Sequence, residues 1–234
     1  MKIMKAIICL AVFSLSFTIQ GFSQSKKSYV TTGGELIFSL ASIEQNGNSE
    51  TSTLRFSPTF NLQTMLNKDI SEKFGIFTGL AIRNVGYIVN DYIDRSNNLT
   101  FKKKFRTYNL GLPVGFKVGN LDKTFFYGGY EVEMAFVYKE KTFEDGDKTD
   151  KITGWFSDRN EIFQHGFLAG IQFPYALNLK FKYYLSEFHN QDFTNNAGIK
   201  PYAELKSNIY YFSLCFFLFR NLDVYITKEK SKTM

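Results

Sequence analysis

Apolar and polar residues alternate at intervals of two along much of the chain. The clearest example is 176–187, where one set of alternate positions is apolar: Leu177, Leu179, Phe181, Tyr183 and Leu185. Lys180 and Lys182 belong to the polar set between them. Because successive side chains of a strand point to opposite faces, this period predicts strands with one apolar and one wet face. Two lysines on the wet face argue against a dry sandwich core and favour a polar lumen.

Eight stretches share this alternation: 29–40, 54–66, 74–88, 106–118, 125–138, 163–173, 176–187 and 208–219. In 74–88 the pattern is less regular, which predicts a bulge near Asn84. Most of the stretches span about 12 to 15 residues, whereas strands of globular proteins average about 5 to 6. A tilted membrane strand needs roughly 9 to 11 residues for the bilayer alone. Strand length therefore favours a membrane barrel.

The connections between these stretches alternate between long and short. The long, polar ones are 41–53, 89–104, 139–162 and 188–207, and the short ones are 67–73, 120–124 and 174–175. Outer-membrane barrels combine short periplasmic turns with longer external loops. The pattern predicts an all-β, antiparallel, up-and-down transmembrane barrel of about eight strands, located in the outer membrane with both termini in the periplasm. A soluble lipocalin-like barrel is the structural alternative.

The first 24 residues have the features of a cleaved export signal. Lys2 and Lys5 precede an apolar run at 6–17, and a small, polar segment ends at Gln24. The run is too short to span a bilayer as a helix, so we expect cleavage near Gln24. The expected organisation is a signal at 1–24, a barrel at 25–219 and a periplasmic tail at 220–234.

Composition and charge limit the classes of molecule that the protein is expected to bind. Aromatic residues make up 18% of the chain, yet the mean hydropathy is −0.19, so apolar groups must be finely segregated. The net charge of +6 comes from scattered lysines and arginines, which does not indicate nucleic-acid binding. Cys215 is the only cysteine outside the predicted signal, so no intramolecular disulfide is expected.

The stretch Arg106–Lys117, which reads RTYNLGLPVGFK, and the other glycine-spaced strands resemble a family of small outer-membrane barrels of the Bacteroidota. This family is described as outer membrane protein beta-barrel domain, and as porin-like or PorT-like. The resemblance covers essentially the whole chain after the signal. It implies an outer-membrane barrel, and for PorT-like members an accessory role in an envelope protein-export machine. One departure is that Arg220–Met234 follow Phe219, where such barrels often end on an aromatic residue.

Ionisable residues on the polar faces predict a charge network inside the barrel: Glu131, Glu133, Lys180 and Lys182, with Arg55, Arg83 and Glu35 as further members. The interior of an eight-stranded barrel is just wide enough for side chains to fill. Unpaired charges in so narrow a space are costly. The network therefore has two interpretations, a salt-bridged plug and a path for ions or solutes, of which the narrow lumen favours the plug.

The sequence offers little support for catalysis. His165 falls on an apolar strand face, which suits an interfacial residue. His189 lies in the last predicted loop near Glu187 and Asp192, where a general base or a weak metal site is an alternative to an ordinary polar loop. No glycine-rich phosphate loop, Cys–His metal spacing or serine elbow is present. We expect no enzyme, cofactor or metal, with a lipid-modifying barrel enzyme as the catalytic alternative.

The connection at 139–162 contains the only tryptophan, in the pair Trp155–Phe156. An exposed pair of this kind is a candidate external contact, and a small hydrophobic tuck in a solvated loop is the alternative. The expected partners are outer-membrane lipid and other envelope proteins. The sequence thus predicts a structural or interaction role, with a narrow porin-like channel or a PorT-like export component as alternatives.

Overall fold

The computed structural model describes residues 27–50, 52–94 and 99–223, and every regular element in these ranges is a β-strand. The strands are β1 (Lys27–Gln45), β2 (Asn48–Glu50), β3 (Ser52–Thr53), β4 (Arg55–Ser57), β5 (Leu62–Asp69), β6 (Phe74–Ile93), β7 (Thr100–Gly119), β8 (Phe125–Glu144), β9 (Asp147–Trp155), β10 (Phe163–Gln172), β11 (Leu177–Tyr184) and β12 (Leu205–Asp223). Within these ranges no helix has the length and apolar character needed to cross a membrane. The predicted signal and the last part of the predicted tail, 224–234, lie outside the described residues.

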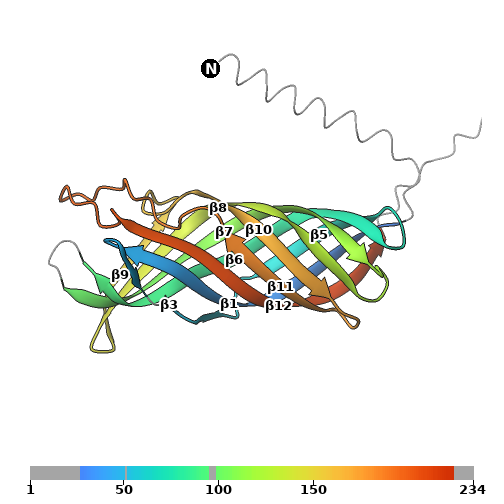
Figure 1. Cartoon of the computed structure of the whole chain (residues 1–234), viewed down its shortest axis with the longest axis horizontal. Helices are drawn as coiled ribbons and strands as arrows, with labels where there is room; N and C mark the ends of the chain where they lie inside the picture. The colour runs from blue at the N-terminus through green and yellow to red at the C-terminus, as the bar shows by residue number, and fades with distance from the viewer. Residues whose placement is uncertain (1–26, 51, 95–98, 224–234) are drawn as a thin grey trace, which may run out of the picture.

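The sheet closes on itself (Figure 1). Eight antiparallel strands follow one another in the order β1, β5, β6, β7, β8, β10, β11 and β12. The ring is completed by β12, which pairs with β1 from Tyr29↔Asp223 to Gln45↔Leu205. Strand β12 thus runs past Phe219, the predicted end of the barrel. The predicted eight-stranded antiparallel barrel is confirmed.

All four long connections are partly strand, the fourth only at its end, where β12 begins at Leu205. Strands β6 and β7 contain 20 residues each and extend to Ile93 and from Thr100, and β8 returns as β9. Two turns are built on Asn46–Gly47, with φ of 52° and 81°, and Asp145–Gly146, with φ of 49° and 93°. Positive φ at both residues is the conformation of two-residue hairpin turns. The prediction of loops at 41–53, 89–104 and 139–162 was therefore wrong in part, because strand pairing continues there.

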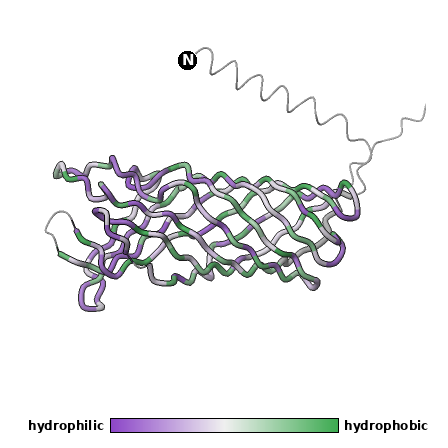
Figure 2. Tube along the Cα trace, in the orientation of Figure 1, coloured by the Kyte–Doolittle hydropathy of each residue, from purple (hydrophilic) through white to green (hydrophobic). Residues whose placement is uncertain are grey.

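The two ends of the barrel differ accordingly. We call the end with the turns at 46–47 and 145–146 the long-hairpin end. The opposite end, where β5 meets β6, β7 meets β8 and β10 meets β11, is the short-turn end. The first described residues of β1 and the last of β12 lie together at the short-turn end (Figure 1). Hydrophilic residues gather toward the long-hairpin end (Figure 2).

The outer face carries a continuous apolar belt. Large apolar side chains on alternate positions are exposed around the wall, among them Leu62, Leu66, Ile76, Leu80, Ile82, Leu110, Leu112, Val114, Phe116, Val132, Phe167, Leu179, Phe181 and Phe212. Their neighbours in the chain point inward, and most of them are buried. Exposed apolar surface of this extent is rare on soluble proteins, whereas a membrane barrel needs it to face lipid.

The predicted bulge near Asn84 is wrong. The pairing of β6 with β7 passes Asn84 in one register, and its shift lies between Val89 and Tyr92. Asn84 interrupts the apolar face for another reason. Its backbone N–H donates to Asn61 Oδ1 at 2.7 Å, and Arg55 donates to its carbonyl and side-chain oxygens. Hydrogen bonds to Asn61 and Arg55 thus allow Asn84 to occupy a position where the alternation calls for an apolar residue. In the sequence, such a polar residue looks like a shift in the alternation.

The belt leads to a prediction about two leucines that are equally exposed. Leu112 and Leu99 each expose 54% of their surface, but Leu112 lies in the middle of the belt and Leu99 lies beyond it, next to the start of β7. We expect Leu112→Arg to lower the free energy of unfolding in vesicles by about 2–4 kcal/mol, because the charge must enter the hydrocarbon region. Leu99→Arg should change it by less than about 0.5 kcal/mol. Urea unfolding of the refolded barrel measures both, and equal effects would contradict a lipid-facing belt.

Candidate functional site

The interior of the barrel is the most elaborate part of the structure. Three zones follow one another along the barrel axis. A vestibule occupies the short-turn half, a charge network crosses the middle, and an aromatic cluster fills the long-hairpin half.

The charge network consists of three acids and three bases that balance in charge: Glu35, Arg83, Glu131, Glu133, Lys180 and Lys182. They project from β1, β6, β8 and β11, and none exposes more than 4% of its surface. Alternation explains their positions, because each lies on the inward set of its strand. Six of the seven residues predicted as lumen charges are thus together, and Arg55 is the exception.

The ion pairs of the network share their partners. Lys182 Nζ donates to Glu131 Oε2 at 2.8 Å and to Glu133 Oε1 at 2.6 Å. Arg83 is paired with both of these glutamates and with Glu35 Oε1, the last at 3.3 Å. Lys180 Nζ also donates to Glu35 Oε1, at 2.5 Å. Each acid therefore faces two cations, which offsets the loss of hydration on burial.

Neutral groups complete the network. The hydroxyl of Tyr184 and the amide of Asn109 each donate to Glu133 Oε2 at 2.7 Å. Gly111 makes room for the contact between Glu131 and Arg83, because a Cβ at this position would collide with Glu131 Oε1. The glycine spacing seen in the sequence thus has a local cause here, the close approach of a charged side chain to the wall.

Arg55 is the predicted member that lies elsewhere. Its guanidinium donates to the carbonyl oxygen of Asn84 at 3.1 Å and to Asn84 Oδ1 at 2.5 Å, and it makes no ion pair with the network. Asn84 follows Arg83 in an extended strand, so their side chains point to opposite sides of the wall. The alternation placed Arg55 in the lumen, but β4 is paired with β1 only at residues 55–57 and the chain leaves the regular wall before β5 begins.

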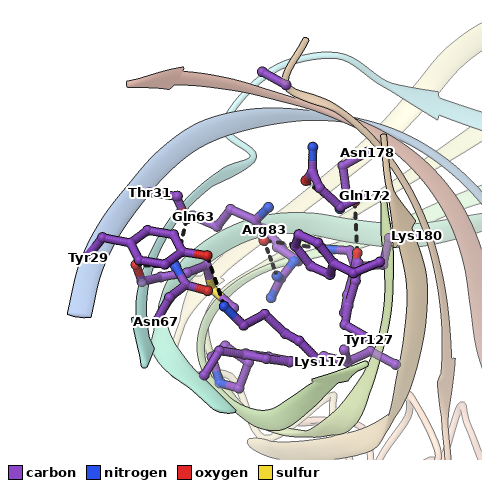
Figure 3. A pocket seen from close by; sticks show the side chains of 16 residues that line it. Tyr29, Thr31, Gln63, Asn67, Arg83, Lys117, Tyr127, Gln172, Asn178 and Lys180 are labelled. Atoms are coloured by element: carbon purple, nitrogen blue, oxygen red, sulfur yellow. Dashed lines mark hydrogen bonds between the residues drawn. The ribbon is translucent and has the colours of Figure 1, made fainter. Parts of the chain in front are cut away.

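The vestibule is a narrow cavity with a water-accessible volume of about 70 Å³. Figure 3 shows polar side chains around it, with Arg83 at its inner end. Near the short-turn end, Lys117 Nζ donates to Asp69 Oδ1 at 2.6 Å and to the hydroxyl of Tyr29 at 2.9 Å. The cavity is lined by both Arg83 and Lys180, so the charge network forms its inner end. The vestibule is therefore open on one side only.

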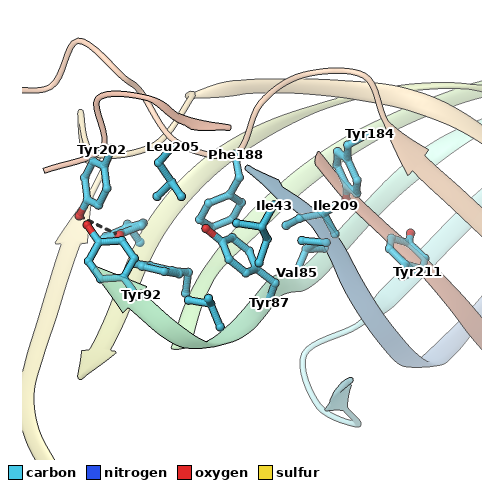
Figure 4. Close-up of a cluster of buried hydrophobic side chains, with 14 of the residues drawn as sticks. Ile43, Val85, Tyr87, Tyr92, Tyr184, Phe188, Tyr202, Leu205, Ile209 and Tyr211 are labelled. Atoms are coloured by element: carbon cyan, nitrogen blue, oxygen red, sulfur yellow. Dashed lines mark hydrogen bonds between the residues drawn. The ribbon is translucent and has the colours of Figure 1, made fainter. Parts of the chain in front are cut away.

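The aromatic cluster closes the long-hairpin half (Figure 4). It contains Tyr87, Tyr92, Phe105, Tyr138, Phe188 and Tyr202, each at most 2% exposed. Residues 188–205 fold back over it from the last long connection, and Tyr202 donates to Glu140 Oε2 at 2.6 Å. Lys103 in turn pairs with Glu140 at 2.8 Å. Side chains thus fill the lumen above the charge network.

His189 lies inside this cluster instead of in an open loop. It is 1% exposed, its Nε2 lies 2.9 Å from the hydroxyl of Tyr87, and its ring stacks on Tyr202 with centroids 4.4 Å apart. Burial lowers the pKa of His189 to about 3, so the ring is neutral at physiological pH. Asp192, its predicted neighbour, is exposed and pairs with Lys200. The idea of a loop site with Asp192 was wrong, because the loop folds inward on its aromatic residues.

The remaining candidates lie on the outer surface. His165 Nδ1 is 2.6 Å from the hydroxyl of Tyr130, which fits the interfacial role expected of it. Trp155 ends β9 and exposes 71% of its surface, and Phe156 exposes 54%. The Trp155 ring lies 6.1 Å from that of Phe136 on the outer face of the wall. In the described ranges, no group of three or more His, Cys, Asp or Glu residues is arranged to hold a metal ion.

The sequence family agrees with this architecture. The family described as outer membrane protein beta-barrel domain matches residues 22–190, well over half of the chain. The chain belongs to this family. The barrel is therefore an outer-membrane protein, as the alternation and the connection lengths predicted. A search of curated proteins finds no match to the sequence.

Several solved barrels are similar in structure. Ail of Yersinia pestis, in complex with the heparin analogue sucrose octasulfate, is 10% identical with a TM-score of 0.38, covering 82% of this chain and 99% of that one. OprG of Pseudomonas aeruginosa is 11% identical with a TM-score of 0.38, covering 83% and 95%. Neisserial surface protein A is 12% identical with a TM-score of 0.35, covering 83% and 99%. Similarity at this level carries no information about function.

The charge network predicts unequal effects for two lysine substitutions. Lys182→Met leaves Glu131 and Glu133 short of a buried cation and should lower the free energy of unfolding by about 3–5 kcal/mol. The matched control is Lys206→Met, because Lys206 and Glu44 form an exposed pair whose loss should cost at most about 1 kcal/mol. Both are measured by urea unfolding in phospholipid vesicles. Equal losses would show that the lumen charges do not act as a buried network.

Proposed function

We propose that this outer-membrane barrel is plugged and has a structural or interaction role, and that it is neither an enzyme nor a channel. The observation that carries the proposal is the filling of the lumen. Between the vestibule and the long-hairpin end stand first the charge network and then the aromatic cluster. A solute would have to break the ion pairs of Arg83 and Lys182 and then displace buried aromatic rings, each step costing several kcal/mol.

The non-enzymatic part of the proposal is supported by the two histidines. A general base must reach the proton that it abstracts. His189 is enclosed by aromatic rings and neutral, and His165 is engaged with Tyr130 on the lipid-facing side of the wall. Neither has the combination of access and a carboxylate partner that activates a nucleophile.

The proposed orientation puts both termini in the periplasm and the long hairpins outside the cell. It is supported by the contrast between the ends, because short turns are periplasmic in outer-membrane barrels. The termini lie with the short turns. The projecting hairpins then give the barrel an external surface of its own. The resemblance to PorT-like barrels of the Bacteroidota suggests that this surface, or the tail, contacts other envelope proteins, which native sizing after mild-detergent extraction would reveal as a stable assembly.

Because the lumen is closed, we predict that the barrel does not conduct ions. The purified barrel, inserted into planar bilayers, should give no discrete conductance steps. Lys182→Ala should also be silent, because the aromatic cluster closes the lumen independently of the charge network. A porin inserted in the same way serves as the positive control. If the wild-type barrel gives conductance steps and Glu131→Gln changes their ion selectivity, the protein is a channel and the plugged function is wrong.

The orientation predicts the labelling of two matched cysteine variants. Asp147→Cys lies at the long-hairpin end and Asp122→Cys at the short-turn end, and both positions are exposed. The native Cys215 is buried and should not react. A membrane-impermeant maleimide should label Asp147→Cys on intact cells and Asp122→Cys only after lysis. The reverse pattern would invert the barrel.

A further inference from the structure

A cluster of positive charge covers the outer face of the wall where β7, β8 and β9 project beyond the apolar belt. It consists of Lys104, Arg106, Lys139, Lys141, Lys148 and Lys151, which we call the basic surface. Strand register brings these residues together. Lys141 is directly opposite Lys104 on one side and Lys151 on the other, and Arg106 is directly opposite Lys139.

The arrangement is unfavourable for the isolated protein. Like charges opposite each other on neighbouring strands are destabilising. In the described part of the chain, none of the six cations makes an ion pair with an acid. Of the acids in the projecting part of the β8–β9 hairpin, Glu140 is on the inward set and pairs with Lys103. The other four, Glu144, Asp145, Asp147 and Asp150, lie at or near the turn and are exposed, and none of these described acids is within ion-pair distance of the six cations. Partial burial and the nearby charges of Arg106, Lys148, Lys104 and Lys151 lower the pKa of Lys141.

The basic surface borders a row of aromatic rings that faces the same way. Phe60, Tyr108, Phe136 and Trp155 follow one another around the wall, with centroids 5.8, 6.5 and 6.1 Å apart. The two features meet at Tyr108, because Arg106 and Lys139 lie 5.7 and 5.1 Å from its ring centroid. On the other side of the row, the belt begins with Leu110 and continues with Leu112. Apolar, aromatic and cationic zones thus succeed each other along the outside of β7.

This order matches the profile of a lipid leaflet with an anionic headgroup. Aromatic girdles mark the interface between hydrocarbon and headgroups. The basic surface lies one step beyond the girdle, at the depth where headgroup phosphates are found. Clustered lysines and arginines at that depth bind anionic lipid headgroups.

We propose that the basic surface binds the phosphate groups of a phosphorylated glycolipid in the outer leaflet, whose acyl chains lie on the belt below. The inference rests on the proposed orientation, which puts the long hairpins on the external side. It commits to a lipid because the cations are continuous with the girdle and the belt. A soluble polyanion would need only the cations.

The test compares two triple variants with the same change in charge. Lys104→Gln/Lys141→Gln/Lys151→Gln removes the row of three facing lysines. Lys123→Gln/Lys200→Gln/Lys206→Gln removes three exposed lysines away from the basic surface. Binding of diphosphorylated lipid A and of its dephosphorylated form is titrated by native mass spectrometry of the detergent-solubilised barrel. Inositol hexakisphosphate serves as the soluble competitor.

The wild-type barrel and the control variant should prefer the diphosphorylated lipid. The first triple variant should bind it on the order of 100-fold more weakly, from about fivefold per lysine. Its urea midpoint should stay equal or rise, because repulsion is relieved, which separates loss of binding from loss of folding. Equal affinity for the two lipids, or equal losses in both triple variants, would overturn the proposal. Full competition by inositol hexakisphosphate would overturn the lipid as the ligand.

The outcome is independent of the lumen. A barrel that conducts ions but keeps the phosphate preference would overturn the plugged function and leave this inference standing. A barrel that does not conduct ions and does not prefer the diphosphorylated lipid would overturn this inference and leave the plugged function standing. Labelling of Asp147→Cys only after lysis would place the basic surface on the periplasmic side of the membrane. This result would overturn the inference, because the inference depends on the proposed orientation.

Discussion

Hydrocarbon offers no partner to a backbone N–H or C=O group, and this constraint governs the structure. Every strand in the bilayer must be paired on both sides, so β12 has to meet β1 and the sheet has no free edge. A ring of eight strands leaves an interior only as wide as its side chains. The polar residues that alternation sends inward must therefore satisfy one another. The shared ion pairs of Arg83 and Lys182 follow from that crowding.

The lumen is filled in two different ways. In the middle of the barrel, acids and bases of equal number neutralise one another, with Asn109 and Tyr184 supplying the remaining hydrogen bonds. Toward the long-hairpin end, aromatic rings take over, and the chain supplies the last of them by folding Phe188 and Tyr202 back inward. The charge network requires each acid to lie next to its bases, whereas the aromatic cluster requires only that side chains fill the space. A substitution that disrupts the charge network therefore leaves the aromatic cluster in place.

Much of this could be predicted from the sequence, because alternation is a local signal. Lys180 and Lys182 lie two residues apart on one strand, as do Glu131 and Glu133, and their inward direction follows from the period. What depends on pairing between distant strands could not be read in this way. Lys104, Lys141 and Lys151 meet only through register, and Arg55 leaves the lumen because its segment departs from the regular wall. Asn46–Gly47 and Asp145–Gly146 were recognisable hairpin turns that the polar character of their surroundings obscured.

The seam between β1 and β12 also has a consequence for biogenesis. It joins Tyr29 to Asp223, nearly the two extremes of the described chain, so no shorter piece of the polypeptide can close the ring. Until β12 pairs with it, β1 presents an unpaired edge. Contacts of such separation form late and slowly, and exposed edges aggregate. Strand β12 therefore supplies the last pairing of the sheet, and without it both β1 and β11 would keep an unpaired edge.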